Sequence, residues 1–282
     1  MHAPRPVLIT GCSSGIGHCV AHGLQARGYR VFASARKSAD VARLREEGLE
    51  AVQLDLDDDA SITLALRTVL EATGGQLYGL FNNGAYGLPG AVEDLSRAAL
   101  RAQLETNLLG WHELTRQVIP VMRAQGEGRI IQNSSILGFV GLPFRGAYNC
   151  SKFALEGLTD TLRVELAGSG IQVSLIQPGP ITSRFRHNAR RMFEASIDTE
   201  RSVHRDKYRA MRERLEKEGP AQPFTLPPEA VLKKVIHALE SRRARPRYYV
   251  TFPTYLLGYL KRLLSSRAFD RLLLKVSGGG RR

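Results

Sequence analysis

Short apolar runs alternate with longer stretches of helical periodicity along most of the chain. The runs are typical of buried strands in a parallel sheet, and the stretches between them are typical of helices that cover such a sheet. The longest helical segments lie at 97–125 and 147–167. This alternation predicts an α/β fold with a doubly wound parallel sheet and helices on both faces. The predicted strands, about seven by this criterion, are Val7–Thr10, Arg30–Ala35, Ala51–Asp55, Leu77–Asn82, Arg129–Asn133, Gln172–Gln177 and Arg247–Thr251.

Polar and glycine-rich segments follow several of these strands directly. Right-handed crossovers bring the carboxyl ends of parallel strands to one edge of the sheet, where ligands bind. The segments at this edge are Gly11–Gly17, Asp55, Asn83, Ser135 and Pro178-Gly179. We therefore expect them to form one site.

The first strand runs into the sequence Thr-Gly-Cys-Ser-Ser-Gly-Ile-Gly at residues 10–17, and a helical stretch follows. Glycines allow the backbone to approach phosphates closely, and a helix N-terminus presents unpaired N–H groups. The spacing is G-x-x-x-G-x-G, so the general dinucleotide fingerprint is not met, and a tight connection is the alternative. Strand, glycine turn and helix in this order favour a dinucleotide site.

Tyr148 and Lys152 are four residues apart on a predicted helix, and Ser135 lies upstream. Residues at this spacing share a helix face, so the ammonium of Lys152 would lie beside the phenol of Tyr148. A neighbouring cation lowers the pKa of a tyrosine from its ordinary value near ~10, which makes the phenol usable as an acid or base. By itself the Tyr-x-x-x-Lys pair is weak, because it also occurs by chance on surface helices.

Taken together, these motifs resemble the classical short-chain dehydrogenases/reductases over residues from about 5 to about 185. The matching segments are Thr10–Gly17, Asp55, Asn82-Asn83-Gly84, Asn107, Ser135, Tyr148, Lys152 and Pro178-Gly179. The resemblance implies a single Rossmann-like domain at 1–251. One departure is that this chain reads Asn-Asn-Gly-Ala at 82–85 where the family usually reads Asn-Asn-Ala-Gly, which leaves the turn there open.

The resemblance also implies a role for each site residue. Tyr148 would be the proton donor or base, Lys152 would lower its pKa and bind the nicotinamide ribose, and Ser135 rather than Ser134 would hold the substrate oxygen. Asn107 would anchor a water that links Lys152 to solvent. Asp55 would contact the adenine, although a helix-capping cluster is the alternative, and Thr182 would hold the carboxamide. The full set of implied cofactor-binding residues is Gly11, Ser13, Ser14, Gly15, Ile16, Gly17, Arg36, Asp55, Asn83, Gly84, Tyr148, Lys152, Pro178, Gly179, Ile181 and Thr182.

The end of the second strand indicates which nicotinamide cofactor is used. NAD-type sites place an acid there to hold the ribose 2′-hydroxyl. This chain has Arg36 and Lys37 instead, whose cations suit a 2′-phosphate, with Ser13 adding a hydroxyl. The sequence favours NADP(H), with NAD(H) as the alternative. A purely structural interpretation is that Arg36 and Lys37 form an ordinary solvated turn with no role in cofactor binding.

Composition agrees with an enzyme of a reducing compartment. The chain has 282 residues and three cysteines without a C-x-x-C pair, so we expect free thiols and no metal site. The first residues lack an apolar signal core, and no stretch of ~20 apolar residues occurs. A cytoplasmic location is expected, with membrane association as a further option.

Residues from Thr182 to about Leu226 lie where the family keeps a mobile lid over the substrate. This segment is rich in arginine (Arg184, Arg186, Arg190, Arg191, Arg201 and Arg205). The arginines could attract an acidic substrate or form an exposed helical face that Glu194, Asp198, Glu200 and Asp206 balance. The second interpretation is favoured.

The C-terminal extension at 252–282 is basic and amphipathic. From Ser241 onward the chain has eleven basic residues and one acid, a net charge of +10 out of +13 for the whole protein. Such a helix suits an anionic membrane surface, with contact at 252–276. The alternative is that Leu256, Leu260, Leu263 and Leu264 dock on the lid or on a second subunit as a wall of the substrate site. Nucleic acid is disfavoured, because the segment is too apolar.

The chain resembles two subgroups of the family, hydroxysteroid and retinol dehydrogenases and bacterial NADP-dependent aldehyde reductases. We therefore expect an NADP(H)-dependent carbonyl reductase/alcohol dehydrogenase acting on a hydrophobic aldehyde, ketone or secondary alcohol. The resemblance also implies a homo-oligomer, dimer or tetramer, paired through the two long helices. The alternatives are a catalytically silent cofactor-binding scaffold and a membrane-surface adaptor that uses the basic tail.

Overall fold

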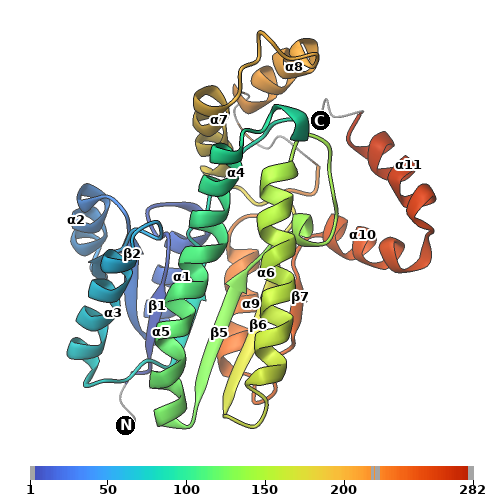
Figure 1. Ribbon diagram of the computed structural model, residues 1–282. Coiled ribbons are helices and arrows are strands. Elements are labelled where there is room, and N and C mark those ends of the chain that lie inside the picture. The colour runs from blue at the N-terminus through green and yellow to red at the C-terminus, as the bar shows by residue number, and fades with distance from the viewer. Residues whose placement is uncertain (1–3, 217–218, 220–222, 279–282) are drawn as a thin grey trace.

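One parallel sheet forms the centre of the molecule, as predicted. The computed structural model describes residues 4–216, 219 and 223–278. All neighbouring strands are parallel, and their order is β3-β2-β1-β4-β5-β6-β7 (Figure 1). The predicted fold class is confirmed. The strands are β1 (Pro6–Ile9), β2 (Arg30–Ala35), β3 (Glu50–Gln53), β4 (Gly79–Asn82), β5 (Gly128–Asn133), β6 (Ile171–Gln177) and β7 (Arg247–Tyr249).

Two hydrophobic cores lie on the two faces of this sheet. In β1, Val7 and Ile9 point into one core and Leu8 into the other, as the alternation of side chains along a strand requires. The first core is closed by α1 (Gly15–Ala26), α2 (Ser38–Glu46) and α9 (Glu229–Glu240). The second is closed by α3 (Asp59–Thr73), α5 (Gly110–Gln125) and α6 (Gly146–Glu165).

The helix predicted at 97–125 is not one continuous α-helix. It consists of α4 (Arg97–Leu104), a π-helical turn η2 (Glu105–Leu109) and α5. A π turn adds a residue to the helical ladder and is found most often at functional sites. Periodicity alone does not reveal such a turn, because the apolar stripe continues on both sides of it.

The segment at 182–226 folds into two helices above the carboxyl edge of the sheet (Figure 1). These are α7 (Phe185–Ser196) and α8 (Arg205–Glu216). The ends of the segment are joined by backbone hydrogen bonds, from Thr182 N to Leu226 O at 3.0 Å and from Leu226 N to Pro180 O at 3.1 Å. The segment therefore has a fixed base and its own apolar interior, centred on Phe193, Tyr208, Met211, Phe144 and Leu88.

The C-terminal helices α10 (Phe252–Leu263) and α11 (Ser266–Val276) pack beside the same edge. Leu257, Phe269 and Leu273 are buried around Val140, close to the short helix η3 (Ile136–Gly138) that follows β5. Of the four leucines considered for docking, Leu260 packs against this cluster, whereas Leu256, Leu263 and Leu264 are exposed. Within the described ranges, none of the helices has the length and apolar character needed to cross a bilayer.

Candidate active site

A cavity of about 600 Å³ opens at the carboxyl edge, under α7 and α8. Most of the predicted site residues line it. Gly17, Arg36, Asp55 and Asn107 are the predicted residues that lie outside its wall. The predicted residues in the wall are Gly11, Ser13, Ser14, Gly15, Ile16, Asn83, Gly84, Ser135, Tyr148, Lys152, Pro178, Gly179, Ile181 and Thr182.

The glycine turn after β1 forms a close-packed cradle. Gly11 and Gly15 have φ of +69° and +61°, a region that favours glycine. A Cβ on Gly11 would lie 2.5 Å from Gly84 Cα, and one on Gly17 would lie 2.4 Å from Gly11 O. No side-chain hydrogen bond caps the first turn of α1. The free N–H groups of this turn and the absence of side chains fit a dinucleotide pyrophosphate.

Asn83 ties this turn to the neighbouring strand ends. Its side-chain amide donates to Thr10 O at 3.0 Å and to Gly11 O at 3.3 Å, and it accepts from the Asn133 amide at 2.8 Å. The Thr10 hydroxyl in turn accepts from the N–H groups of Asn83 and Gly84. The turn at 82–85 therefore closes on β1 despite its departure from the usual family sequence.

Lys152 lies at the end of this network. Its ammonium donates to Asn133 O at 2.9 Å and lies 4.1 Å from the centre of the Trp111 ring. Burial lowers the pKa of Lys152 to about 7, and the Glu156 carboxylate one turn further along α6 acts in the opposite direction. In the protein by itself, this ammonium therefore holds its proton only weakly.

Tyr148 lies in the same wall, 5.7 Å from the Lys152 ammonium measured to the ring centre. Burial raises the pKa of Tyr148 above its usual value, and a hydrogen bond with the Ser135 hydroxyl lowers it to a smaller extent. The net direction is opposite to the one predicted from the Tyr-x-x-x-Lys spacing. The physical reason is that both groups are desolvated, so Lys152 is itself a weak source of charge.

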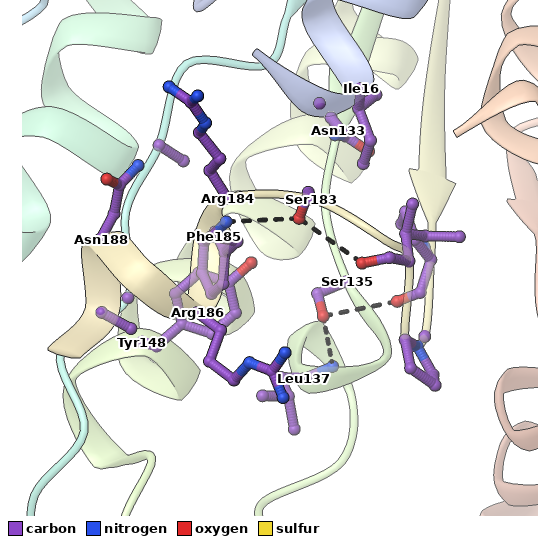
Figure 2. Close-up of a pocket in the computed structure, with 18 of the residues that line it drawn as sticks. Ile16, Asn133, Ser135, Leu137, Tyr148, Ser183, Arg184, Phe185, Arg186 and Asn188 are labelled. Atoms are coloured by element: carbon purple, nitrogen blue, oxygen red, sulfur yellow. Dashed lines mark hydrogen bonds between the residues drawn. The ribbon is translucent and has the colours of Figure 1, made fainter. Parts of the chain in front are cut away.

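Ser135, not Ser134, faces Tyr148. The Ser135 hydroxyl accepts from Leu137 N at 3.1 Å and lies 3.5 Å from Pro178 O (Figure 2). The Ser134 hydroxyl lies against Gly138 and the Glu156 carboxylate instead. The predicted choice between the two serines agrees with these positions.

Asn107 sits in the π turn behind the cavity. Its amide donates to Tyr86 O at 2.8 Å and to the Ser151 hydroxyl at 3.3 Å, and its oxygen accepts from Tyr86 N at 3.1 Å. These bonds hold the loop after β4 against α6. The role of Asn107 as anchor of a water that links Lys152 to solvent stays a prediction.

Arg36 and Asp55 lie at the rim, on the ends of β2 and β3. Arg36 is exposed, and its carbonyl accepts from the Gln53 amide at 3.0 Å. Asp55 is half-buried, and its carboxylate accepts from Asp57 N at 3.2 Å. The cap of α3 is Asp58, so Asp55 itself is not the helix cap.

Sequence reasoning missed several residues of the wall. The Phe185 ring packs edge-on against Tyr148, with 5.3 Å between ring centres. Arg145 and Arg214 also line the cavity. These three residues belong to none of the sequence motifs, so no local signal identified them. Asn149 lies outside the wall and donates to Leu137 O at 2.8 Å and to Val140 O at 2.7 Å, which fixes the loop between β5 and α6.

A possible metal-binding group lies elsewhere. Among the residues that the structure describes, His18, His22 and Glu47 place ligand atoms within 4.8 Å of one another. Both imidazoles hydrogen-bond to the Glu47 carboxylate, which Arg43 also contacts. These contacts account for the cluster, and none of its members lines the cavity.

Comparison with known proteins gives consistent matches. Residues 5–193 match the family described as short chain dehydrogenase. An uncharacterized oxidoreductase of Escherichia coli, YbbO, is 43% identical over 269 residues, which cover 95% of this chain and 94% of that protein. Human 17-beta-hydroxysteroid dehydrogenase type 1 is 33% identical over 260 residues, covering 87% and 77% of the two chains. Retinol dehydrogenase 8 of cattle also matches.

Solved structures match over most of the chain as well. The actinorhodin polyketide ketoreductase with NADPH has a TM-score of 0.71 and 28% identity, and the match covers 88% of this chain and 95% of the other. Other solved relatives hold NAD.

Proposed function

The chain belongs to the short-chain dehydrogenase/reductase family and is an NAD(P)-dependent oxidoreductase acting on CH–OH groups, and we propose that it is an NADP(H)-dependent carbonyl reductase/alcohol dehydrogenase for hydrophobic substrates. The observation that supports this most is the meeting of Tyr148 and Ser135 hydroxyls in a cavity that also contains the glycine cradle. This arrangement suits proton transfer at a carbonyl oxygen beside a nicotinamide ring.

Each residue has a definite task in the reductive direction. Ser135 donates a hydrogen bond to the substrate oxygen and so orients it at Tyr148. Tyr148 gives its proton to that oxygen, and its raised pKa means that it holds the proton firmly until negative charge develops there. Lys152 gains charge when an anion binds nearby, which then favours the tyrosinate after transfer. The bound nicotinamide supplies the hydride.

The preference for NADP(H) is proposed from the charges at the rim. Arg36 follows β2 and is exposed, where a 2′-phosphate would need a cation. Arg36→Gln is expected to weaken NADPH binding about tenfold, since a charge-assisted hydrogen bond contributes roughly 1.5–3 kcal/mol, and to leave NADH binding unchanged. Arg67→Gln, on the exposed side of α3, is the matched control. Equal losses for the two cofactors would contradict the assignment.

The proposed reaction is tested by steady-state oxidation of NADPH with a panel of apolar aldehydes and ketones. Tyr148→Phe removes the proton donor and keeps the ring against Phe185, so turnover should fall by roughly 10²–10⁴ while the Kd for NADPH is retained. An unchanged rate in this variant would remove Tyr148 from the mechanism. A catalytically silent scaffold would show NADPH binding without turnover of any member of the panel.

A second proposal concerns contact with an anionic membrane surface through α10. Its exposed apolar residues fall at successive helical positions on one face (Phe252, Tyr255, Leu256, Tyr259 and Leu263), beside Lys261 and Arg262. The opposite face of the helix is occupied by its packing around Val140. Truncation would therefore expose the apolar cluster around Val140, and point variants are the better test.

Leu263 is 80% exposed and Tyr259 58%, so replacing both by aspartate should leave the fold intact. Co-sedimentation with phosphatidylserine vesicles should then fall several-fold, with Leu64→Asp on α3 as the control. Equal pelleting of all three proteins would exclude α10 as a membrane contact.

The oligomeric state and the location are further proposals. α6 carries the exposed apolar residues Phe153, Leu158 and Val164, which supports pairing of two copies through this helix. Light scattering during size-exclusion chromatography would detect a dimer or tetramer. The three free cysteines support a reducing, cytoplasmic location.

A further inference from the structure

Three arginines from three elements line the cavity that contains Tyr148. Arg145 precedes α6, Arg186 lies in the first turn of α7, and Arg214 lies in the last turn of α8. Together with Lys152 and Arg184 they give the wall five basic residues. No aspartate or glutamate lines the cavity in the part of the chain that the structure describes.

The three guanidinium groups lack acidic partners. Arg145 donates to its neighbour's carbonyl, Phe144 O, at 2.8 Å, and Arg186 donates to Gly219 O. Arg186 Nη1 is buried without a hydrogen-bond partner. Among residues 4–216, 219 and 223–278, none of the three forms a salt bridge.

A neighbour on the same helix behaves differently. Arg190 of α7 bonds to Glu194 at 2.7 Å and to Glu216 at 3.0 Å, and it lies outside the cavity wall. The expected balance of lid arginines by local acids therefore holds for Arg190 but is wrong for Arg186. Figure 2 shows Arg184 and Arg186 leaving the backbone in opposite directions, with Arg186 extending to the Leu137 side of the cavity.

The arginines also disturb one another. Burial, with the nearby Arg214 as a second cause, lowers the pKa of Arg145 to about 9. Burial and the nearby Arg186 lower the pKa of Arg214. Desolvated like charges without counterions cost stability, and a bound anion would remove that cost. The cluster is therefore unfavourable for folding and suited to binding.

We propose that Arg145, Arg186 and Arg214 form a receptor for an anionic group at the end of the substrate remote from the carbonyl. The inference rests on the proposed reductase function, because it places the reacting carbonyl at Tyr148. Apolar side chains of the same wall, including Phe185, Leu142 and Leu215, fit an aliphatic body. The substrate class is thus an amphiphilic aldehyde or ketone that carries a carboxylate or a phosphate ester.

Both anions share the chemistry that guanidinium groups recognise. Their oxygens accept charge-assisted hydrogen bonds from guanidinium N–H groups, and Arg186 Nη1 is unpartnered while Nη2 donates to Gly219 O. A neutral alcohol or alkyl end forms no ion pair with these guanidinium groups. The proposal therefore predicts discrimination by charge at equal chain length.

Binding to the NADPH-saturated enzyme measures this discrimination without any turnover. Titration calorimetry with octanoate, octyl phosphate and octanol should give octanoate or octyl phosphate at least about tenfold tighter than octanol. The tighter of the two anions identifies which class the receptor takes. Wild-type protein that binds octanol as tightly as both anions would overturn the proposal.

Matched variants locate the effect. Arg214→Gln and Arg186→Gln should each weaken anion binding about tenfold and leave octanol binding unchanged, whereas Arg190→Gln should change neither. Arg214→Lys keeps the charge and should recover part of the affinity, which separates loss of charge from loss of fold. An equal effect of Arg190→Gln would show that general charge, and not this cluster, attracts the anion.

Turnover then separates this inference from the function on which it rests. With octanal and the aldehyde-acid of the same chain length, kcat/KM should favour the acid, and Arg214→Gln should abolish that preference. If neither aldehyde reacts but octanoate binding still depends on the arginines, the reductase proposal fails and the receptor stands. If octanal reacts and the acid is not preferred, the receptor proposal fails alone.

Discussion

Gly17→Ala tests whether the contact between α1 and the glycine turn is essential to cofactor binding. The added Cβ would lie 2.4 Å from Gly11 O and 2.7 Å from the Asn83 side-chain nitrogen. Ordinary contacts of carbon with a carbonyl oxygen are about 3.3–3.6 Å, so the helix must move by about 1 Å. Both neighbours are held, Gly11 by its backbone conformation and Asn83 by its hydrogen bonds, so neither can yield easily.

The magnitude follows from two opposing effects. Overpacking costs roughly 1–3 kcal/mol, and the better helix propensity of alanine offsets up to about 1 kcal/mol. We expect the free energy of unfolding in urea to fall by about 0.5–2 kcal/mol. The displaced N-terminus of α1 should also weaken NADPH binding about tenfold, measured by the fluorescence of the bound nicotinamide.

Gly157→Ala on the exposed side of α6 is the matched control. Its Cβ would meet nothing within 4 Å, so this variant should be stabilised by about 0.5–1 kcal/mol and bind NADPH normally. If Gly17→Ala bound NADPH within twofold of wild type and unfolded at the same urea concentration, the close-packed cradle would not be what the cofactor requires.

Three further predictions follow from buried groups. The pKa of Lys152 is about 7 in the folded chain against 10.5 in the unfolded chain. Between these pH values the unfolded state binds more protons than the folded state. The free energy of unfolding therefore rises with pH there, by at most about 1.4 kcal/mol per pH unit. Lys152→Met should lack this rise between pH 7 and 8.5 in urea titrations. Asn83→Ala removes hydrogen bonds to Thr10, Gly11 and Asn133, so it should cost about 3 kcal/mol at roughly 1 kcal/mol each, and an unchanged urea midpoint would contradict the network. Cys150 is exposed, whereas burial raises the pKa of Cys12 to about 12, so a disulfide reagent should modify Cys150 in the native protein and leave Cys12 untouched until unfolding.

The sheet and the location of the site could be predicted from sequence because both depend on local patterns. Apolar runs such as Val7–Ile9 must be buried, and parallel strands bring their carboxyl ends together whatever their spacing along the chain. The two predicted strands at the ends of the sheet were extended too far, to Asp55 and Thr251, by two residues each. At these ends the apolar pattern continues into the loop after the ladder has stopped.

The features that sequence did not predict depend on burial, which a local pattern does not report. The spacing of Tyr148 and Lys152 predicts their proximity but not that both are desolvated, and desolvation decides the direction of the pKa of Tyr148. Likewise Arg186 and Arg190 are one helical turn apart. Which of them faces the cavity depends on how α7 docks over the sheet, and this is set by contacts distant in sequence.

Hydrogen bonds connect the glycine turn through Asn83 and Asn133 to Lys152, which lies beside Tyr148. Changes that retune nucleotide selectivity inside this hydrogen-bonded chain would therefore also alter the acidity at the reacting oxygen. Substitutions around Arg36, which lies outside this hydrogen-bonded chain, should change nucleotide selectivity without changing the acidity at the reacting oxygen.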